Sequence, residues 1–127
     1  GGYIKNDIRA WLEKEINWQL VGDEEEDREL LEGIRILNFG AGHTFGMMGL
    51  LVALKDSGNY LLVSDCINTK ENYGPPVRFP GLAYDTIGYQ KTVERIRRLE
   101  KQYQAKVLFG HDIGQYRQLK FVPEYYT

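Results

Sequence analysis

Apolar residues follow helical spacing in two parts of the chain. Over residues 6–18 they recur three and four positions apart, which predicts an amphipathic helix with Asn6 or Asp7 as its N-cap. A second helical pattern follows Asp85, another suitable N-cap, and its apolar side carries Tyr89, Val93, Ile96, Leu99 and Tyr103. We therefore expect one helix near the beginning of the chain and a longer one in its second half.

Short apolar runs between turn residues predict strands. The first, at residues 34–39, ends at Gly40, and a later one, "KVLFGHD", stops at a glycine-histidine pair. Between them, "GLLVAL" and "YLLVSD" are separated by "KDSGN", which predicts a hairpin with a glycine-containing turn. Both of these runs are apolar throughout, so we expect both faces of the hairpin to be covered.

Length and composition predict one globular domain spanning residues 1–127. Hydrophobic residues make up 43% of the chain and charged residues 27%, as in soluble globular proteins. The net charge of −2 provides no long-range attraction for nucleic acid. The basic residues Arg95, Arg97, Arg98 and Lys101 alternate with acidic ones, so we interpret them as a solvated helix face rather than a phosphate-binding patch. We interpret the acidic segment of residues 22–29 as a solvated loop rather than a metal site.

Cysteine content and hydropathy indicate in which cellular compartment the protein is located. The single cysteine, Cys66, excludes a disulfide within the chain and is typical of a reducing environment. No apolar run approaches the roughly 18 residues that a membrane span needs. We therefore expect a cytoplasmic protein with no membrane partner.

Three residues of metal-binding type lie where predicted strands begin or end. His43 precedes one strand, Asp65 ends the next, and His111 follows the strand after the long helix. Functional side chains converge at strand ends on one edge of a sheet. Imidazoles and carboxylates are ligands for zinc or a similar divalent ion. Each histidine alone is equally compatible with a tight turn, but the three residues together indicate a metal site.

The sequence around these residues resembles the second half of the metallo-β-lactamase-fold hydrolases, most of all the N-acyl-homoserine lactonases that open quorum-sensing lactones. The likeness lies in "GHTFG", "SDCINTKENYG" and "FGHDIGQYRQLKFVPEYY", in the family's order and spacing. It covers nearly the whole chain. It implies an α/β (α+β) fold class: half of an αββα sandwich, with one mixed β-sheet and helices on one face.

The resemblance also implies a chemistry. In the family, the His43 position supplies a histidine to one metal centre, the Asp65 position bridges two ions, and the His111 position binds the second ion. Two zinc ions lower the pKa of a shared water, and the resulting hydroxide attacks a lactone or ester carbonyl. Asp112 is compatible either with orienting His111 or with an ordinary surface loop.

The chain departs from the family pattern in two ways that affect activity. Its two histidines leave no place for the H-x-H-x-D-H motif, so we expect a C-terminal half that is inactive alone and holds zinc weakly or not at all. Its sheet would then expose an apolar face, covered by the missing N-terminal half or by self-association. Asn68 stands where lactonases carry a tyrosine, and its amide can still donate a hydrogen bond to an oxyanion.

Two further interpretations remain open at this stage. Cys66 is either a thiolate ligand or a buried side chain pointing away from Asp65 across the strand, and Met47 and Met48 are either soft-metal ligands or packing residues. In function, the alternative to a hydrolase of lactones or esters is a metal-free interaction or regulatory domain that has kept the half-fold.

Overall fold

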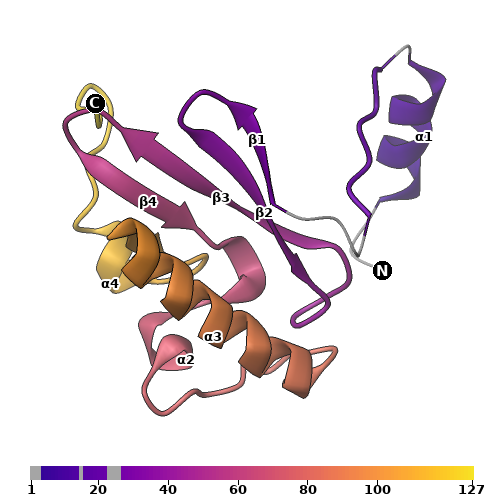
Figure 1. Cartoon of the computed structure of the whole chain (residues 1–127). Helices are drawn as coiled ribbons and strands as arrows, with labels where there is room; N and C mark the ends of the chain where they lie inside the picture. The colour runs from indigo at the N-terminus through magenta and orange to yellow at the C-terminus, as the bar shows by residue number, and fades with distance from the viewer. Residues whose placement is uncertain (1–3, 15, 23–26) are drawn as a thin grey trace.

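The computed structural model describes residues 4–14, 16–22 and 27–127, and its centre is a five-stranded sheet (Figure 1). The strands lie in chain order, and all neighbours are antiparallel except the parallel pair β4 and β5. A mixed sheet with helices confirms the predicted α/β class. The strands are β1 (Arg28–Leu31), β2 (Ile34–Gly40), β3 (Met47–Leu54), β4 (Gly58–Leu62) and β5 (Lys106–Leu108).

Four α-helices and one 3-10 turn complete the described elements. They are α1 (Lys5–Glu13), η1 (Ser64–Cys66), α2 (Lys70–Tyr73), α3 (Thr86–Tyr103) and α4 (Ile113–Tyr116). Within the ranges that the structure describes, no helix combines the length and hydropathy needed to cross a bilayer.

The first helix forms where its apolar spacing predicts it, but it begins differently. Its N-cap is Ile4, whose carbonyl accepts hydrogen bonds from Asp7 N at 3.0 Å and Ile8 N at 3.2 Å. Asn6 and Asp7 lie inside the first turn, so the prediction that one of them is the cap was wrong. The helix lies apart from the sheet and buries none of its residues (Figure 1).

The strand predictions are confirmed for β2 and for the β3–β4 hairpin, which closes at the pair Leu54 and Gly58. The acidic segment needs a partial correction. Its residues 23–26 lie outside the described residues, but Arg28 and Glu29 belong to β1 because they pair with Ile36 and Arg35 of β2. Backbone pairing with a neighbouring strand therefore outweighs the local charge pattern.

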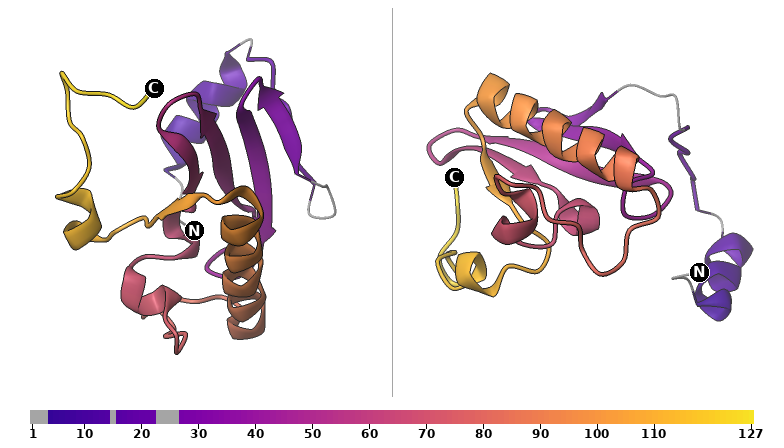
Figure 2. Two further views of the ribbon diagram at one scale, coloured as in Figure 1. Left: turned by 60° about the vertical axis from the view of Figure 1, so that its left-hand side comes forward. Right: turned by 90° about the horizontal axis from the view of Figure 1, so that it is seen from below.

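Helix α3 packs on one face of the sheet and forms the core with it (Figure 2). Its N-terminus is capped as predicted, since Asp85 Oδ1 accepts from Ile87 N at 3.0 Å. The Thr92 hydroxyl donates to Phe39 O at 3.2 Å and ties the helix to β2. The core joins Leu37, Phe39, Leu51 and Leu61 of the sheet, and Val63 directly after β4, to helix residues Tyr89, Val93, Ile96 and Leu99.

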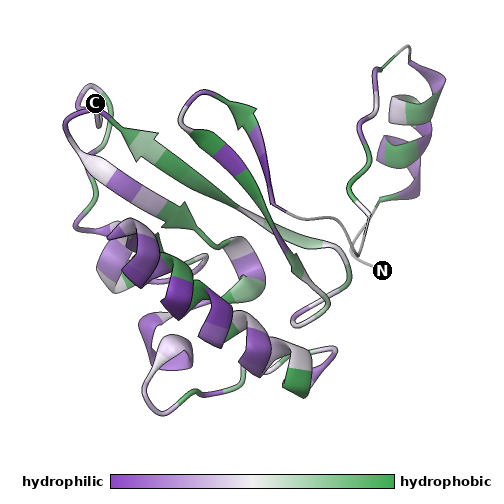
Figure 3. Cartoon of the chain, viewed as in Figure 1, coloured by the Kyte–Doolittle hydropathy of each residue, from purple (hydrophilic) through white to green (hydrophobic). Residues whose placement is uncertain are grey.

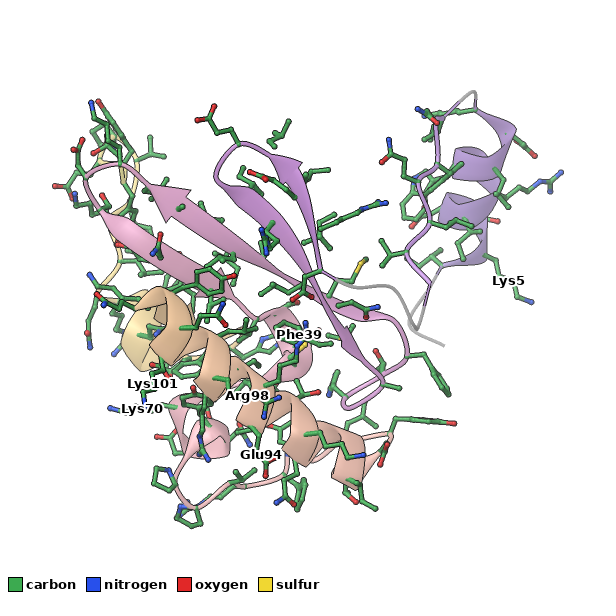
Figure 4. The ribbon with its side chains drawn as sticks, in the orientation of Figure 1. Lys5, Phe39, Lys70, Glu94, Arg98 and Lys101 are labelled. Atoms are coloured by element: carbon green, nitrogen blue, oxygen red, sulfur yellow. The ribbon has the colours of Figure 1, made fainter. Side chains whose placement is uncertain are left out.

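The basic residues of α3 are only partly a solvated face. Arg98 and Lys101 are exposed (Figure 4), as predicted. Arg95, however, donates to Asn38 O and pairs with Asp27, and Arg97 donates to Tyr73 O. These partners are distant in sequence, which is why the local charge pattern alone led to the wrong interpretation of Arg95 and Arg97.

The other face of the sheet is apolar and open in the described part of the molecule. A hollow of about 380 Å³ is lined by Leu30, Ile36, Met48, Leu50 and Leu62, together with Gly49 and Ser64. Met48 is 46% exposed there and Leu30 is 50% exposed. Figure 3 shows that β3 is hydrophobic along most of its length. The expectation that both faces of the hairpin are covered was therefore wrong for this face.

Candidate functional site

Asp65 lies in the 3-10 turn that follows β4. The strand ends at Leu62, and Val63 N then donates to Leu108 O at 3.2 Å. Ser64 adopts a φ of 48°, which turns the chain into η1. The prediction that Asp65 ends the strand was therefore inexact, because the strand stops before it and the side chain projects from a turn.

His111 is brought beside this turn by backbone hydrogen bonds between two loops. Gly110 N donates to Ile67 O at 3.1 Å, and His111 N donates to Asn68 O at 2.8 Å. As a result, His111 Nε2 lies 2.7 Å from Asp65 Oδ1. The structure thus joins two of the predicted ligands, which are 46 positions apart in the chain.

The Asp65–His111 pair lies at the surface. The side chains are 47% and 63% exposed, respectively, and a polar contact that solvent reaches to this degree contributes little to stability. The loops are instead held by their backbone hydrogen bonds. A carboxylate oxygen and an imidazole nitrogen therefore meet at a position that solvent or a ligand can reach.

His43 is held by a different contact. Its Nδ1 lies 2.9 Å from Leu82 O, so the tautomer protonated at Nδ1 donates this bond and leaves Nε2 free to accept a proton or bind a metal. The turn that carries His43 is anchored near the start of α3, because Tyr84 N and Asp85 N both donate to Gly42 O.

The described residues do not form a complete metal site. Within residues 4–14, 16–22 and 27–127, no group of three or more His, Cys, Asp or Glu side chains is close enough to hold an ion. The structure brings Asp65 and His111 together and does not add His43 to the same group.

Asn68 belongs to the loop after β4, between η1 and α2. Its backbone carbonyl accepts from His111 N, and its side-chain Oδ1 is buried without a hydrogen-bond partner among the described residues. Burying an unpaired amide oxygen costs about 1–3 kcal/mol. The side chain that was predicted to donate to an oxyanion therefore also has an acceptor that nothing within the described structure satisfies.

Asp112 and Gln115 organise the loop of His111. Asp112 Oδ1 accepts from Gln115 N at 2.8 Å and its Oδ2 accepts from Lys70 N at 2.9 Å, and these bonds lower the pKa of the carboxyl. Gln115 Oε1 accepts from Phe109 N at 2.8 Å. The sequence pattern did not indicate Gln115, because nothing local distinguishes it from a surface glutamine.

The soft-ligand interpretations are not favoured by the geometry. Cys66 is only 1% exposed, and burial, with a smaller contribution from the Asp65 charge, raises the pKa of its thiol to about 12. The thiol is therefore protonated at neutral pH and packs in the core, as one of the two interpretations predicted. Met47 packs against the same core, whereas Met48 lines the open sheet face.

Comparison with characterised proteins identifies relatives of this chain. It is 50% identical over 117 residues to the N-acyl homoserine lactonase AiiB of Agrobacterium fabrum, an alignment that covers 92% of this chain and 42% of the relative. It is 30% identical over 123 residues to an N-acyl homoserine lactonase of Bacillus cereus, covering 97% and 47%. The chain is homologous to the N-acyl homoserine lactonases. This confirms the resemblance that the motifs around Asp65 and His111 indicated.

Solved structures agree with this homology. One, an N-acyl homoserine lactone hydrolase with the product N-hexanoyl-L-homoserine bound at its catalytic metal centre, has a TM-score of 0.75 and 27% identity, and the match covers 97% of this chain and 50% of that one. No family model matches the sequence. The chain thus spans about half the length, or slightly less, of the lactonases it matches.

Proposed function

We propose that this chain is the C-terminal half of a metal-dependent hydrolase that cleaves a lactone or ester bond. The observation that carries this proposal is the 2.7 Å approach of His111 Nε2 to Asp65 Oδ1 at an accessible position. Lactonase homology over 92% of the chain supports the same reaction class.

The donor atoms are of the types that bind divalent ions, but they are too few to complete a site. Catalytic zinc sites use three protein ligands and leave a position open. Asp65 and His111 supply two neighbouring donors, and His43 has its Nε2 available beside α3. In this proposal, the remaining ligands and the closure of the site come from the other half of the complete protein.

The residues of this chain would then have distinct roles. When bound, two zinc ions would supply a water of lowered pKa and stabilise developing negative charge. Asp65 would hold both ions, while His111 and His43 would each hold one. Asn68 would donate its amide N–H to the substrate carbonyl oxygen, an interaction that is strongest when that oxygen gains charge.

The alternative is a metal-free interaction domain. The open apolar face of the sheet favours it, since exposed apolar patches of this kind mark binding surfaces. The two functions are distinguished by the metal content and activity of the complete protein.

We expect the complete protein to contain two zinc ions and to open N-acyl homoserine lactones, and the 127-residue chain alone to do neither. The measurements are elemental analysis of the purified proteins and chromatographic detection of ring-opened product. A complete protein free of divalent metal, yet folded, would favour the interaction domain. Tight binding of two zinc ions by the 127-residue chain would contradict the proposed division of the site.

The apolar sheet face should make the isolated chain associate with itself. Burying a methionine side chain contributes about 1.5–3 kcal/mol, so placing a charge there with Met48→Glu should weaken dimerisation at least about tenfold. Sedimentation velocity over a concentration series measures this. Val122→Glu is the matched control, because Val122 is 95% exposed and does not line this face. A wild-type chain that stays monomeric at all concentrations would refute the prediction.

A further inference from the structure

The Asp65–His111 pair is formed by two loops that meet edge to edge. The loop after β4 carries Asp65, and the loop after β5 carries His111. Besides the Asp65–His111 contact itself, three hydrogen bonds between described residues connect the loops through a backbone group, and their partners follow the same order along both loops. They run from Gly110 N to Ile67 O, from His111 N to Asn68 O, and from Lys70 N to Asp112 Oδ2. Only the last of the three uses a side chain.

The Asp112 side chain accepts hydrogen bonds from the segments that follow both loops. Asp112 Oδ2 accepts from Lys70 N, the first residue of α2, while Oδ1 accepts from Gln115 N in the first turn of α4. One carboxylate therefore satisfies backbone donors from both segments that flank the pair. It needs both of its oxygens to do so.

Gln115 stabilises the loop after β5 through two hydrogen bonds of its side chain. Its Oε1 accepts from Phe109 N at 2.8 Å, and its Nε2 donates to Val107 O at 2.7 Å. Because Gln115 N is itself bound by Asp112, residues 107–115 form a closed unit with His111 inside it. Movement of Asp112 is therefore transmitted to His111.

We propose that Asp112 is a positioning residue that holds Asp65 and His111 at their mutual distance by tying α2 to α4. The importance of that distance rests on the proposed function, in which the two side chains share an ion. Asp112 acts through backbone groups rather than on the reacting atoms, since both of its oxygens are occupied by N–H donors.

The competing explanation is that Asp112 only caps α4. A cap needs one acceptor, and asparagine serves as an N-cap about as well as aspartate. A tie between two loops needs two acceptors, and asparagine has one oxygen and a donor amide. Asp112→Asn therefore separates the explanations: it preserves a cap but cannot satisfy both Lys70 N and Gln115 N.

The test uses the 127-residue chain without metal, with Asp112→Asn and Asp112→Ala. We expect Asp112→Asn to remain folded, to speed amide hydrogen exchange at Lys70 or Gln115 at least about tenfold, and to weaken the nuclear Overhauser effect between the His111 ring and Asp65. Asp85→Asn is the matched control, because Asp85 caps α3 with a single bond from Ile87 N. It should leave the His111 signals unchanged.

The outcomes decide between the two explanations. If Asp112→Asn leaves both amides protected and the His111 signals as in the wild type, Asp112 is only a cap and the proposal is wrong. If Asp112→Ala does not fold, the asparagine variant still decides. The result is also independent of the proposed function: altered His111 signals in Asp112→Asn would stand even if Asp65 proved unnecessary for hydrolysis.

Discussion

Asp65→Ala should reduce lactone hydrolysis by the complete protein more than 100-fold while leaving it folded. Replacing a residue that merely orients a metal ligand typically costs 10–100-fold, and removing the ligand itself should cost at least as much. The fold should survive because Asp65 is half exposed and its side chain pairs only with the exposed His111 in the described structure. Product formation under saturating substrate and the thermal melting curve measure the two effects.

The control for this variant is Asp56→Ala, which removes an exposed carboxylate from the β3–β4 turn, away from the candidate site. It should leave activity within about twofold and stability within about 0.5 kcal/mol. Asp65→Asn adds a second comparison, because it keeps an oxygen near His111 but removes the negative charge. Retained turnover in Asp65→Ala would eliminate the bridging role and, with it, the metal-site proposal.

The parts of the fold with strong periodicity were predictable from sequence. Helix α3 has five apolar residues on one side behind Asp85, so local spacing and capping agree with its packing on the sheet. The β3–β4 hairpin was predictable for the same reason, since two apolar runs flank a glycine-containing turn. In both elements, residues that are close together in the sequence determine the secondary structure.

The short elements of the site were not predictable. Helices α2 and α4 have four residues each, too few to show a helical period. The first residue of α2, Lys70, also donates its backbone N–H to Asp112, a partner 42 positions away that the local sequence does not indicate. The turn at η1 depends on a left-handed φ at Ser64, a residue type that does not usually adopt it.

The sequence therefore indicated candidate residues for the site, but their arrangement was only partly predictable. The motifs indicated Asp65 and His111, and the structure brings them into contact. The same motifs indicated His43, which contacts Leu82 instead. Whether these residues bind metal stays a prediction, and the distances between them depend on contacts between segments that are far apart in the sequence.

Gly110→Ala should lower both stability and activity while leaving all the predicted ligands in place. A Cβ on Gly110 would lie 2.6 Å from Ser64 O and 2.8 Å from Ser64 C, which are backbone atoms that have no rotamer to change. The two loops must then separate, and the hydrogen bonds from Gly110 N to Ile67 O and from His111 N to Asn68 O are lost or lengthened. Overpacking of this kind costs about 1–3 kcal/mol of stability.

Gly110→Ala should also lower the activity of the complete protein. Displacing a catalytic group by about 1 Å can cost about 100-fold in rate, and the added methyl group needs a separation of that order to fit. Gly81→Ala is the matched control, because its Cβ would meet no atom within 4 Å. The measurements are turnover of the complete protein and chemical denaturation of both variants. Equal turnover and equal stability of Gly110→Ala and Gly81→Ala would contradict this prediction. The close contact between the loops would then not be the feature that holds His111 beside Asp65.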